Sequence, residues 1–396
     1  MKILILIISF LVTAEKFSVA QEYDFSGLEK HFQSYIDDGR LPCASILIIK
    51  ENNIIYESHL GLQDNESGKH VSANTIFRLA SLTKPVTAVA VLTLAENGLI
   101  DPDDYLYNYL PEFKNLKFYN SDEEITPVTI RQLLTHTSGM SSGLEQDEVG
   151  QLYREMYKKD ISSLEDLSNS IAGLPLAEKP GTKFIYSHSS DVLAYLVEKV
   201  SGLPFDEYLR ENIFKPLEMN STGFTVDKEE IQNVASLYVI EDSKLSKAGN
   251  NEDLTDRITN FPKGNGGLLS TVHDYSNFCL MLLNEGEFNG KQFLKKETVK
   301  ELRTNQIPED KLPITIAGVT MSGMGFGYSV GVSVEPNPLG VIPGTFGWIG
   351  GSHTQFFIDP VNKIIGIMFS QLGRAQNSKA IPEFNPLVYE ALGITN

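Results

Sequence analysis

The chain has 396 residues, 41% of them hydrophobic and 21% charged, which is typical of a globular protein with one large domain or two lobes. Its formal net charge of −18, without any basic block, argues against nucleic acid or an anionic membrane as a partner. Net charge says little about the fold, which has to be predicted from the order of strands and helices along the chain.

The first twenty residues have the pattern of a cleavable signal peptide. Met1-Lys2 is a short basic start, Ile3 to Leu11 is an apolar run, and Ser18 and Ala20 are small residues before a mature start at Gln21. The run is too short to span a bilayer, and no later segment is apolar for long enough. We therefore expect residues 1–20 to be removed and the protein to be secreted or periplasmic, without stable membrane insertion. The alternative is a buried N-terminal helix.

Strand-like runs lie near both ends of the chain and helical runs lie between them. Two apolar runs flank a hairpin turn at residues 51–53, and further strands are expected at 327–335, 354–359 and 363–371. The expected helices cover residues 25–38, 86–98, 129–134, 190–200, 274–283 and 386–392. This order predicts an α/β (α+β) fold in which one antiparallel sheet is built from both termini. Residues 21–80 and 255–396 would form the α/β lobe, residues 81–254 a helical lobe, and the cleft between them a small-molecule site.

The cysteines and histidines give no sign of a metal site. Cys43 lies in a strand-like run and Cys279 in a helical one, so a disulfide is permitted by an oxidising compartment, although two buried free thiols are favoured. The seven histidines form no HExxH motif or cluster with ligand spacing. We expect neither a metal nor another cofactor.

The stretch SLTK places Ser81 three residues before Lys84, at the start of an apolar helical run. Residues three apart lie on one helix face, so the lysine amine can reach the serine hydroxyl. Pro85 falls in the first turn, where the loss of a backbone N–H costs least. Alone, this spacing is unspecific, because it occurs by chance in most chains of this size.

Five stretches, including the one that contains Ser81 and Lys84, match the motifs of one protein family in the same order, which makes the spacing specific. The chain resembles the class C β-lactamase-like serine hydrolases, which include penicillin-binding proteins and β-lactamase-like esterases. The matching stretches are FRLASLTKPVTAVAVLTLAENGLI (77–100), TIRQLLTHTSGM (129–140), FIYSHSSDVLAYLVEKVSG (184–202), GNGGLLSTVHDYSNFCLMLLNEG (264–286) and GTFGWIGGSHTQFFIDP (344–360). The resemblance implies that family's two-lobe fold and acyl transfer, with Ser81 attacking a carbonyl to form an acyl-enzyme.

The resemblance also implies the partners of Ser81. Lys84 and Tyr186 match the family's lysine and tyrosine, and the sequence leaves open which of them accepts the serine proton. The backbone N–H groups of Ser81 and Gly351 would form the oxyanion hole.

Two motifs depart from the lactamase pattern. His188 stands where Tyr-x-Asn has asparagine, which leaves a site-lining role and plain packing as alternatives. Trp348, Ile349 and Gly350 replace Lys-Thr-Gly, so the cation that would bind a substrate carboxylate is missing, which favours neutral acyl groups. Arg374, just past the final strand, is an alternative source of that cation.

Other residues of these stretches need separate treatment. Ile349 should narrow the pocket, and His353, where a glycine is common, receives no role. Residues 139–143 fit the G-x-S-x-G elbow, but a helical run precedes Ser141 where that motif needs a strand, so Ser141 is not the expected nucleophile. His136 is expected to be a structural hydrogen-bonder.

These observations predict an exported serine hydrolase that cleaves carboxylic esters or similar acyl bonds of a small molecule. A β-lactamase or D-Ala-D-Ala-type peptidase is the alternative within enzymes. A non-catalytic penicillin-binding-like receptor is the alternative outside them, although it would be expected to have lost Ser81, Lys84 or Tyr186. A monomer is presumed.

Overall fold

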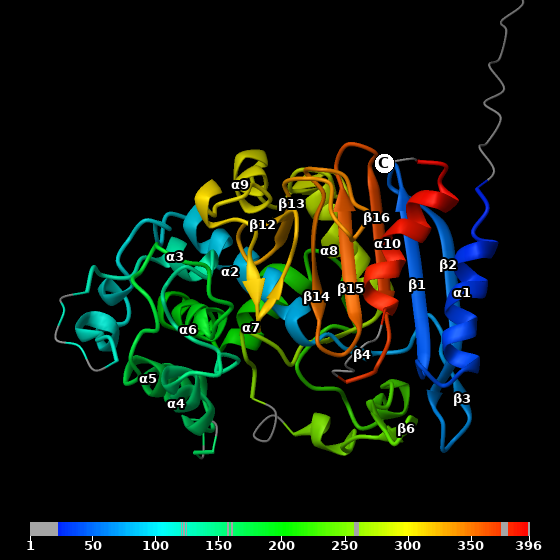
Figure 1. Ribbon diagram of the computed structural model, residues 1–396, viewed down its shortest axis with the longest axis horizontal. Helices are drawn as coiled ribbons and strands as arrows, with labels where there is room; N and C mark the ends of the chain where they lie inside the picture. The colour runs from blue at the N-terminus through cyan, green and yellow to red at the C-terminus, as the bar shows by residue number, and fades with distance from the viewer. Residues whose placement is uncertain are drawn as a thin grey trace, which may run out of the picture.

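A large antiparallel sheet forms the centre of the molecule (Figure 1). The computed structural model describes residues 23–119, 121, 123, 125–156, 158–159, 161–256, 261–373 and 379–394. The predicted signal peptide and Arg374 lie outside these residues. The eight strands have the order β12-β13-β14-β15-β16-β1-β2-β3. Their bounds are β1 (Cys43–Lys50), β2 (Asn53–Asp64), β3 (Lys69–His70), β12 (Met324–Phe326), β13 (Gly331–Ser333), β14 (Phe346–Gly350), β15 (Thr354–Asp359) and β16 (Ile364–Phe369).

The two ends of the chain meet in the middle of this sheet. Strand β1 pairs with β16 in antiparallel register, from Ser45 opposite Phe369 to Lys50 opposite Ile364. Both strands are buried almost throughout, which is why their sequences read as continuous apolar runs rather than as alternating ones. The fold therefore confirms the predicted α/β architecture with a sheet built from both termini.

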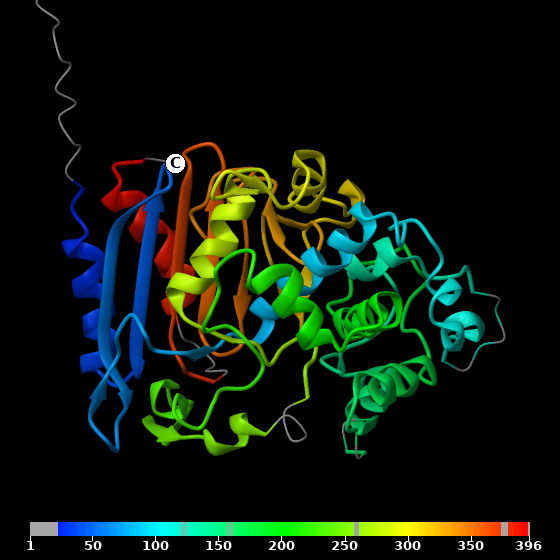
Figure 2. The ribbon, with the colours of Figure 1, turned by 180° about the vertical axis from the view of Figure 1, so that it is seen from behind.

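Helices cover both faces of the sheet. Helices α1 (Ser26–Asp37) and α10 (Ala380–Ala391) pack against each other and lie on the face that Figure 1 presents, whereas α8 (Val272–Leu283) covers the opposite face, seen in Figure 2. Phe32, Phe357 and Phe384 lie in the apolar core under α1 and α10. The core on the other face of the sheet is continuous with the core of the helical segment that lies, in sequence, between the N-terminal and the C-terminal strands.

The segment between β4 and β7 contains the remaining large helices. Figure 1 shows α3 to α6 gathered at the end of the molecule away from α1. Helix α2 is buried on nearly all sides, in keeping with its apolar sequence. Helix α3 begins with a capping box between Thr129 and Gln132, and α6 ends at Gly202, whose φ of +73° suits glycine. The helices are α2 (Thr83–Glu96), α3 (Ile130–Leu134), α4 (Glu148–Met156), α5 (Leu164–Ala172), α6 (Ser189–Ser201) and α7 (Phe205–Leu209).

Short elements complete the described structure. Strand pairs form between neighbouring segments, and β4 with β7 joins the residues before α2 to those before α8. The bounds are β4 (Phe77–Arg78), β5 (Tyr238–Glu241), β6 (Lys244–Lys247), β7 (Leu269–Ser270), β8 (Glu287–Phe288), β9 (Lys291–Gln292), α9 (Lys296–Leu302), β10 (Thr315–Ile316) and β11 (Val319–Thr320). The exact lobe boundaries at residues 80/81 and 254/255 stay a prediction.

Two expected elements differ in the structure. The expected strand at 327–335 is broken, because a turn separates β12 from β13; a Cβ on Gly327 would lie 2.0 Å from the carbonyl oxygen of Leu302. The last helix begins at Ala380 rather than at Pro386, which lies inside it. Packing of Phe384 against the sheet and α1 offsets the hydrogen bond that the proline cannot donate.

Candidate active site

Ser81 lies in a tight turn that opens helix α2. Ala80, just before it, has a φ of +49°, in the left-handed region that costs a non-glycine residue free energy. The Thr83 hydroxyl donates a 2.8 Å hydrogen bond to the Ala80 carbonyl and holds this turn. Ser81 is consequently presented, partly exposed, at the N-terminus of a 14-residue helix, where the helix dipole favours negative charge.

Lys84 contacts Ser81 as the spacing predicts. Its Nζ lies 3.3 Å from Ser81 Oγ and donates a 2.7 Å hydrogen bond to the carbonyl of Asn265. The same amine lies over the ring of Tyr186, 4.7 Å from the ring centroid. The side chain is only 3% exposed, so it is held beneath the serine and not in solvent.

Tyr186 is fixed by aromatic neighbours. Its phenol oxygen accepts a 3.2 Å hydrogen bond from Trp348 Nε1, and the two ring centroids lie 5.6 Å apart. His136 stacks on the tyrosine ring at 5.0 Å and 30°. Burial lowers the pKa of His136 well below its usual value, aided by the charges of Lys84 and His188, so the stacked imidazole is neutral at pH 7. Its Nδ1 accepts a hydrogen bond from the Ser187 backbone.

His188 belongs to a buried chain of hydrogen bonds that reaches Lys84. Its Nδ1 lies 2.9 Å from Asp191 Oδ2, and its Nε2 lies 3.2 Å from the carbonyl oxygen of Ser142. The other Asp191 oxygen accepts a 3.0 Å hydrogen bond from the Asn265 backbone N–H. Asn265 in turn supplies the carbonyl that binds Lys84. His188 and Asp191 are 5% and 1% exposed, so this chain is part of the interior.

The end of β14 lies against the turn that precedes Ser81. A Cβ on Gly350 would lie 2.4 Å from the Leu79 carbonyl oxygen and 2.1 Å from Thr354 Oγ1, so only glycine fits. Thr354 Oγ1 donates a 3.0 Å hydrogen bond to the same carbonyl. Gly351, the predicted second oxyanion donor, follows directly and is exposed.

Successive residues of β14 face opposite sides of the sheet. Trp348 pairs with Phe356, and Ile349 pairs with Gln355 on the other face. Ile349 thus lies on the face away from Trp348 and lines a pocket with Gln355. Arg374 lies outside the described residues, so its predicted role as a cation stays a prediction.

Ser141 lies in a setting unlike a nucleophile elbow. Helix α3 ends at Leu134 and no strand precedes Ser141, whose side chain is fully buried. Its hydroxyl donates a 2.5 Å hydrogen bond to Glu145 and accepts one of 2.9 Å from the Gly143 N–H. These contacts stabilise the loop between α3 and α4.

Sequence reasoning missed the residues that support Lys84 from behind. A Cβ on Gly264 would lie 1.8 Å from the Ser190 carbonyl oxygen, so this glycine allows the next residue, Asn265, to approach Lys84. The GNGG stretch was a usable signal, since a paired glycine motif indicates close backbone approach. His353, left without a role, has a φ of +57° and donates from Nδ1 to the Leu372 carbonyl at 2.8 Å, which explains why glycine also suits this position.

Neither a metal site nor a membrane span is found in the described ranges. No group of three or more His, Cys, Asp or Glu side chains there is arranged to hold a metal ion. None of the helices in these ranges is long and apolar enough to cross a bilayer. Cys43 and Cys279 are both buried free thiols, as the sequence favoured.

Comparison with solved structures shows the class of fold. The structure described as "EstCE1, a hydrolase with promiscuous acyltransferase activity" superposes with a TM-score of 0.81 at 24% identity, over 92% of this chain and 98% of the other. This protein, with a sheet built from strands near both chain ends and helices inserted between them, therefore has the β-lactamase-like fold.

The chain belongs to the Beta-lactamase family, whose pattern residues 28–383 match. Esterase EstB of Burkholderia gladioli is 34% identical over 202 residues, which is 50% of each chain. A protein of Escherichia coli (strain K12) described as a putative D-alanyl-D-alanine carboxypeptidase is 25% identical over 98% of this chain and 93% of its own. Relatives of this chain thus include both an esterase and a carboxypeptidase-like protein.

Proposed function

We propose that the protein is a serine hydrolase that forms an acyl-enzyme on Ser81 and cleaves carboxylic esters or similar acyl bonds. The observation that carries the proposal is the contact between Ser81 Oγ and Lys84 Nζ at 3.3 Å, with the lysine buried beneath the ring of Tyr186. A buried amine beside a partly exposed hydroxyl is the arrangement expected of an activated nucleophile.

In the acylation step, Ser81 Oγ attacks the ester carbonyl and its proton passes to the base. The carbonyl carbon becomes tetrahedral and its oxygen takes the negative charge. The C–O bond to the alcohol then breaks, and the alkoxide leaves with the proton held by the base. Water adds to the acyl-enzyme by the same sequence and releases the acid.

We assign the role of base to Tyr186 and that of the assisting cation to Lys84, on the charge that surrounds the phenol. The indole N–H of Trp348 donates to the phenol oxygen and stabilises negative charge there. Lys84, 4.7 Å from the centre of the same ring, adds a positive charge on the serine side. Lys84 as the direct acceptor is the second possibility, because its amine lies 3.3 Å from Ser81 Oγ.

The oxyanion would be stabilised by the backbone N–H groups of Ser81 and Gly351. Ser81 stands at the start of α2, where N–H groups have no partner within the helix. The packing of Gly350 against Leu79 supports a position for Gly351 beside Ser81.

A neutral acyl substrate suits the site best. Trp348 borders Tyr186 at the position where the lactamase pattern has lysine, and an indole cannot bind a carboxylate as a cation does. The resemblance to Esterase EstB supports the same preference. The resemblance to the putative carboxypeptidase, which extends over more of the chain, supports peptide or β-lactam cleavage as the second candidate.

Two substrates separate these candidates. Hydrolysis of p-nitrophenyl butyrate and of nitrocefin is measured with the protein and with Ser81→Ala. The proposal expects ester turnover that exceeds nitrocefin turnover by at least about a hundredfold and that disappears in Ser81→Ala. Strong nitrocefin turnover with negligible ester cleavage would favour the lactamase candidate, and no Ser81-dependent turnover of either would favour the non-catalytic receptor.

Export and a monomeric state complete the proposal. The apolar run at residues 3–11 and the small residues at 18 and 20 support cleavage after Ala20. N-terminal sequencing of protein recovered from outside the cytoplasm tests this, with Gln21 as the expected first residue.

A further inference from the structure

His136 bonds to the chain on both sides of Tyr186. Its backbone carbonyl accepts a 2.8 Å hydrogen bond from the Ile185 N–H. Its Nδ1 accepts one of 3.0 Å from the Ser187 N–H. Because the residues before and after Tyr186 are both bonded to His136, one residue of the loop after α3 fixes the backbone that carries the phenol.

The imidazole of His136 also packs on the ring of Tyr186. The two ring centroids lie 5.0 Å apart, and the ring planes are inclined by 30°. Phe326 meets the imidazole edge-on at 5.4 Å and meets the indole of Trp348 at 5.0 Å. Trp348 in turn contacts the ring of Tyr186 at 5.6 Å. The four rings thus form a closed cluster in which each ring contacts two others.

This placement is unfavourable for His136 itself. Its φ of +54° lies in the left-handed region, which a histidine adopts at a cost in free energy. Because Nδ1 accepts the Ser187 N–H, the proton of the neutral ring lies on Nε2, which is buried without a hydrogen-bond partner in the described part of the chain. Backbone strain and an unpaired buried N–H at one residue beside the candidate active site indicate that the residue serves that site.

We propose that His136 is a positioning residue, which holds Tyr186 in the place where its phenol meets Trp348 and its ring meets Lys84. The inference rests on the proposed function, in which Tyr186 is the base. The phenol oxygen lies 3.2 Å from Trp348 Nε1, and the ring centroid lies 4.7 Å from Lys84 Nζ. Both distances depend on how the backbone and the ring of the tyrosine are held. A neutral imidazole holds them without adding a positive charge next to Lys84.

Turnover of p-nitrophenyl butyrate by His136 variants tests this role. His136→Ala, which removes the ring and the Nδ1 acceptor, should lower kcat about 100-fold and leave KM within about threefold, because misplacing a catalytic group by about 1 Å costs that much. His136→Asn, which restores an acceptor near the position of Nδ1 and adopts a positive φ readily, should recover at least about tenfold of the loss. His31→Ala, at the contact between α1 and α10, is the control and should match the unmodified protein.

A double-mutant cycle separates positioning of the tyrosine from support of the fold. In Tyr186→Phe protein, which lacks the proposed base, His136→Ala should change kcat by no more than about threefold, since its effect passes through the phenol. Equal losses from His136→Ala in the two backgrounds would overturn the proposal, as would a loss that appears only in KM. If His136→Ala does not fold by circular dichroism, His136→Gln replaces it, because the longer amide leaves the Ser187 N–H without its acceptor, and it must then lower kcat at least about tenfold.

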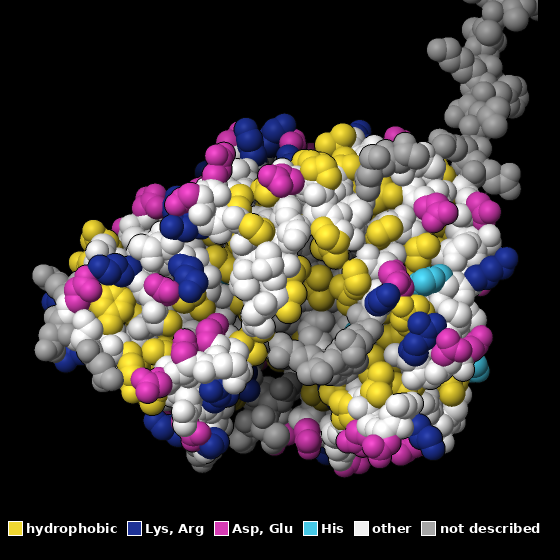
Figure 3. All heavy atoms as spheres, in the orientation of Figure 1, with side chains coloured by type: hydrophobic (Ala, Val, Ile, Leu, Met, Phe, Trp, Pro, Cys, Tyr) yellow, Lys and Arg dark blue, Asp and Glu magenta, His cyan; other side chains and the backbone are white. Residues whose placement is uncertain are grey.

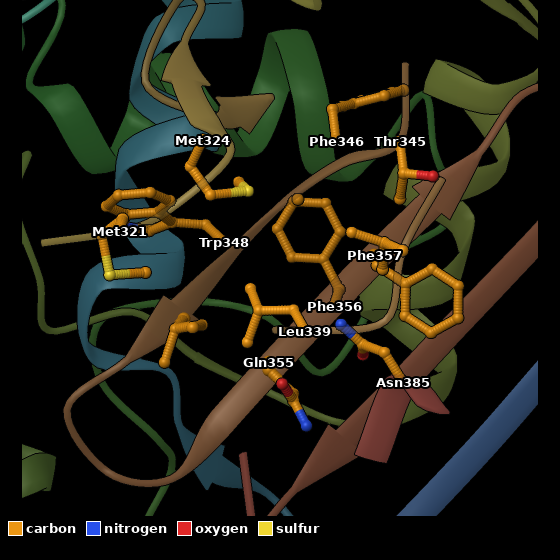
Figure 4. Close-up of a pocket in the computed structure, with 13 residues that line it drawn as sticks. Met321, Met324, Leu339, Thr345, Phe346, Trp348, Gln355, Phe356, Phe357 and Asn385 are labelled. Carbon is orange, nitrogen blue, oxygen red and sulfur yellow. The ribbon is translucent and has the colours of Figure 1, made fainter. Parts of the chain in front are cut away.

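The only tryptophan of the protein reports the position of Tyr186 without turnover. Trp348 is 7% exposed, and Figure 4 shows its indole beside Met321 and Met324, which line the same pocket. In Figure 3, hydrophobic side chains surround a hollow in the middle of the face on which β14 lies. Because its surroundings are apolar, the emission of Trp348 should respond to loss of the hydrogen bond to Tyr186 and to entry of water.

Emission maxima and acrylamide quenching constants are measured for the unmodified protein, Tyr186→Phe, His136→Ala and His136→Asn. We expect His136→Ala and Tyr186→Phe each to be quenched at least about 1.5-fold more strongly than the unmodified protein, and His136→Asn to match it. Without Ser81-dependent turnover the proposed function fails, and the emission then decides alone whether His136 holds Tyr186. Emission and quenching of His136→Ala equal to those of the unmodified protein would overturn the inference.

Discussion

The indole Nε1 of Trp348 lies 3.2 Å from the phenol oxygen of Tyr186 and donates a hydrogen bond to it. The two residues are 162 positions apart in the chain, one in β14 and one just before α6. Strand β14 therefore contributes a direct contact to the site, because its tryptophan donates a hydrogen bond to the tyrosine that we propose as the base. A lysine at this position would bind a substrate carboxylate, whereas the indole serves the enzyme's own tyrosine.

Trp348→Phe should lower kcat for p-nitrophenyl butyrate by about 10- to 100-fold. The substitution keeps an aromatic wall but removes the N–H that stabilises charge on Tyr186, and a hydrogen bond to a charged group is worth about 1.5–3 kcal/mol. Steady-state kinetics measure the effect. In a double-mutant cycle with Tyr186→Phe, which alone should cost two to four decades, the second substitution should add little. Full additivity would mean that the indole acts independently of Tyr186.

Asp191→Ala should lower kcat about 100-fold and leave KM within a few-fold, because Asp191 positions the Asn265 carbonyl that binds Lys84. His188→Ala should have the same character and a smaller effect of about tenfold, because His188 contacts the side chain of Asn265 and not the backbone that supplies the carbonyl. The matched control is His273→Ala, on the surface of α8. A change confined to KM would mean that these hydrogen bonds serve substrate binding and not the positioning of Lys84.

Ser141→Ala should leave ester turnover within about twofold while lowering stability by about 1–2 kcal/mol. The hydroxyl makes a buried hydrogen bond to Glu145, and the variant leaves that carboxylate without it. Urea unfolding and initial rates on the same preparation separate the two effects. Loss of activity at unchanged stability would identify Ser141 as the nucleophile after all.

The protein should become less stable as the pH falls from 7 to 5, with His136 as one cause. Burial lowers the pKa of His136 in the folded state, so the unfolded chain binds a proton near pH 6.5 that the folded chain does not. This residue alone contributes a slope of up to about 1.4 kcal/mol per pH unit over that range. His136→Gln should therefore show a shallower decrease in urea-unfolding free energy, and His70→Gln, on the surface, should match the unmodified protein. Equal slopes in all three would contradict this assignment.

The sequence predicted those parts of the structure that depend on residues close together in the chain. The helix that begins near Ser81 and the contact of Lys84 with it follow from a three-residue spacing on one helix face. Apolar runs near both ends of the chain also predicted one sheet built from both termini, and the pairing of β1 with β16 confirms that sheet without having been predicted itself. Ordered motifs, in turn, indicated that Tyr186 and Trp348 lie near Lys84.

What the sequence did not reveal depends on contacts between distant backbone segments. Asn265 binds Lys84 through its backbone carbonyl, which any residue could supply, and its side-chain Nδ2 lies 3.1 Å from His188 Nδ1, a contact between distant segments that the sequence did not indicate. His353 is explained by a left-handed φ and a bond to Leu372, neither of which a single sequence encodes. Pro386 suggested a helix start, but packing of Phe384 extends the helix before it.

Reaction with a fluorophosphonate tests the central claim most directly, since the reagent bonds only to an activated hydroxyl. The folded protein is labelled, digested, and its peptides are analysed by mass spectrometry. One adduct is expected, on Ser81, at a rate that falls in Lys84→Ala and with complete loss in Ser81→Ala. An adduct on another serine, or none in protein that is folded by circular dichroism, would contradict the account.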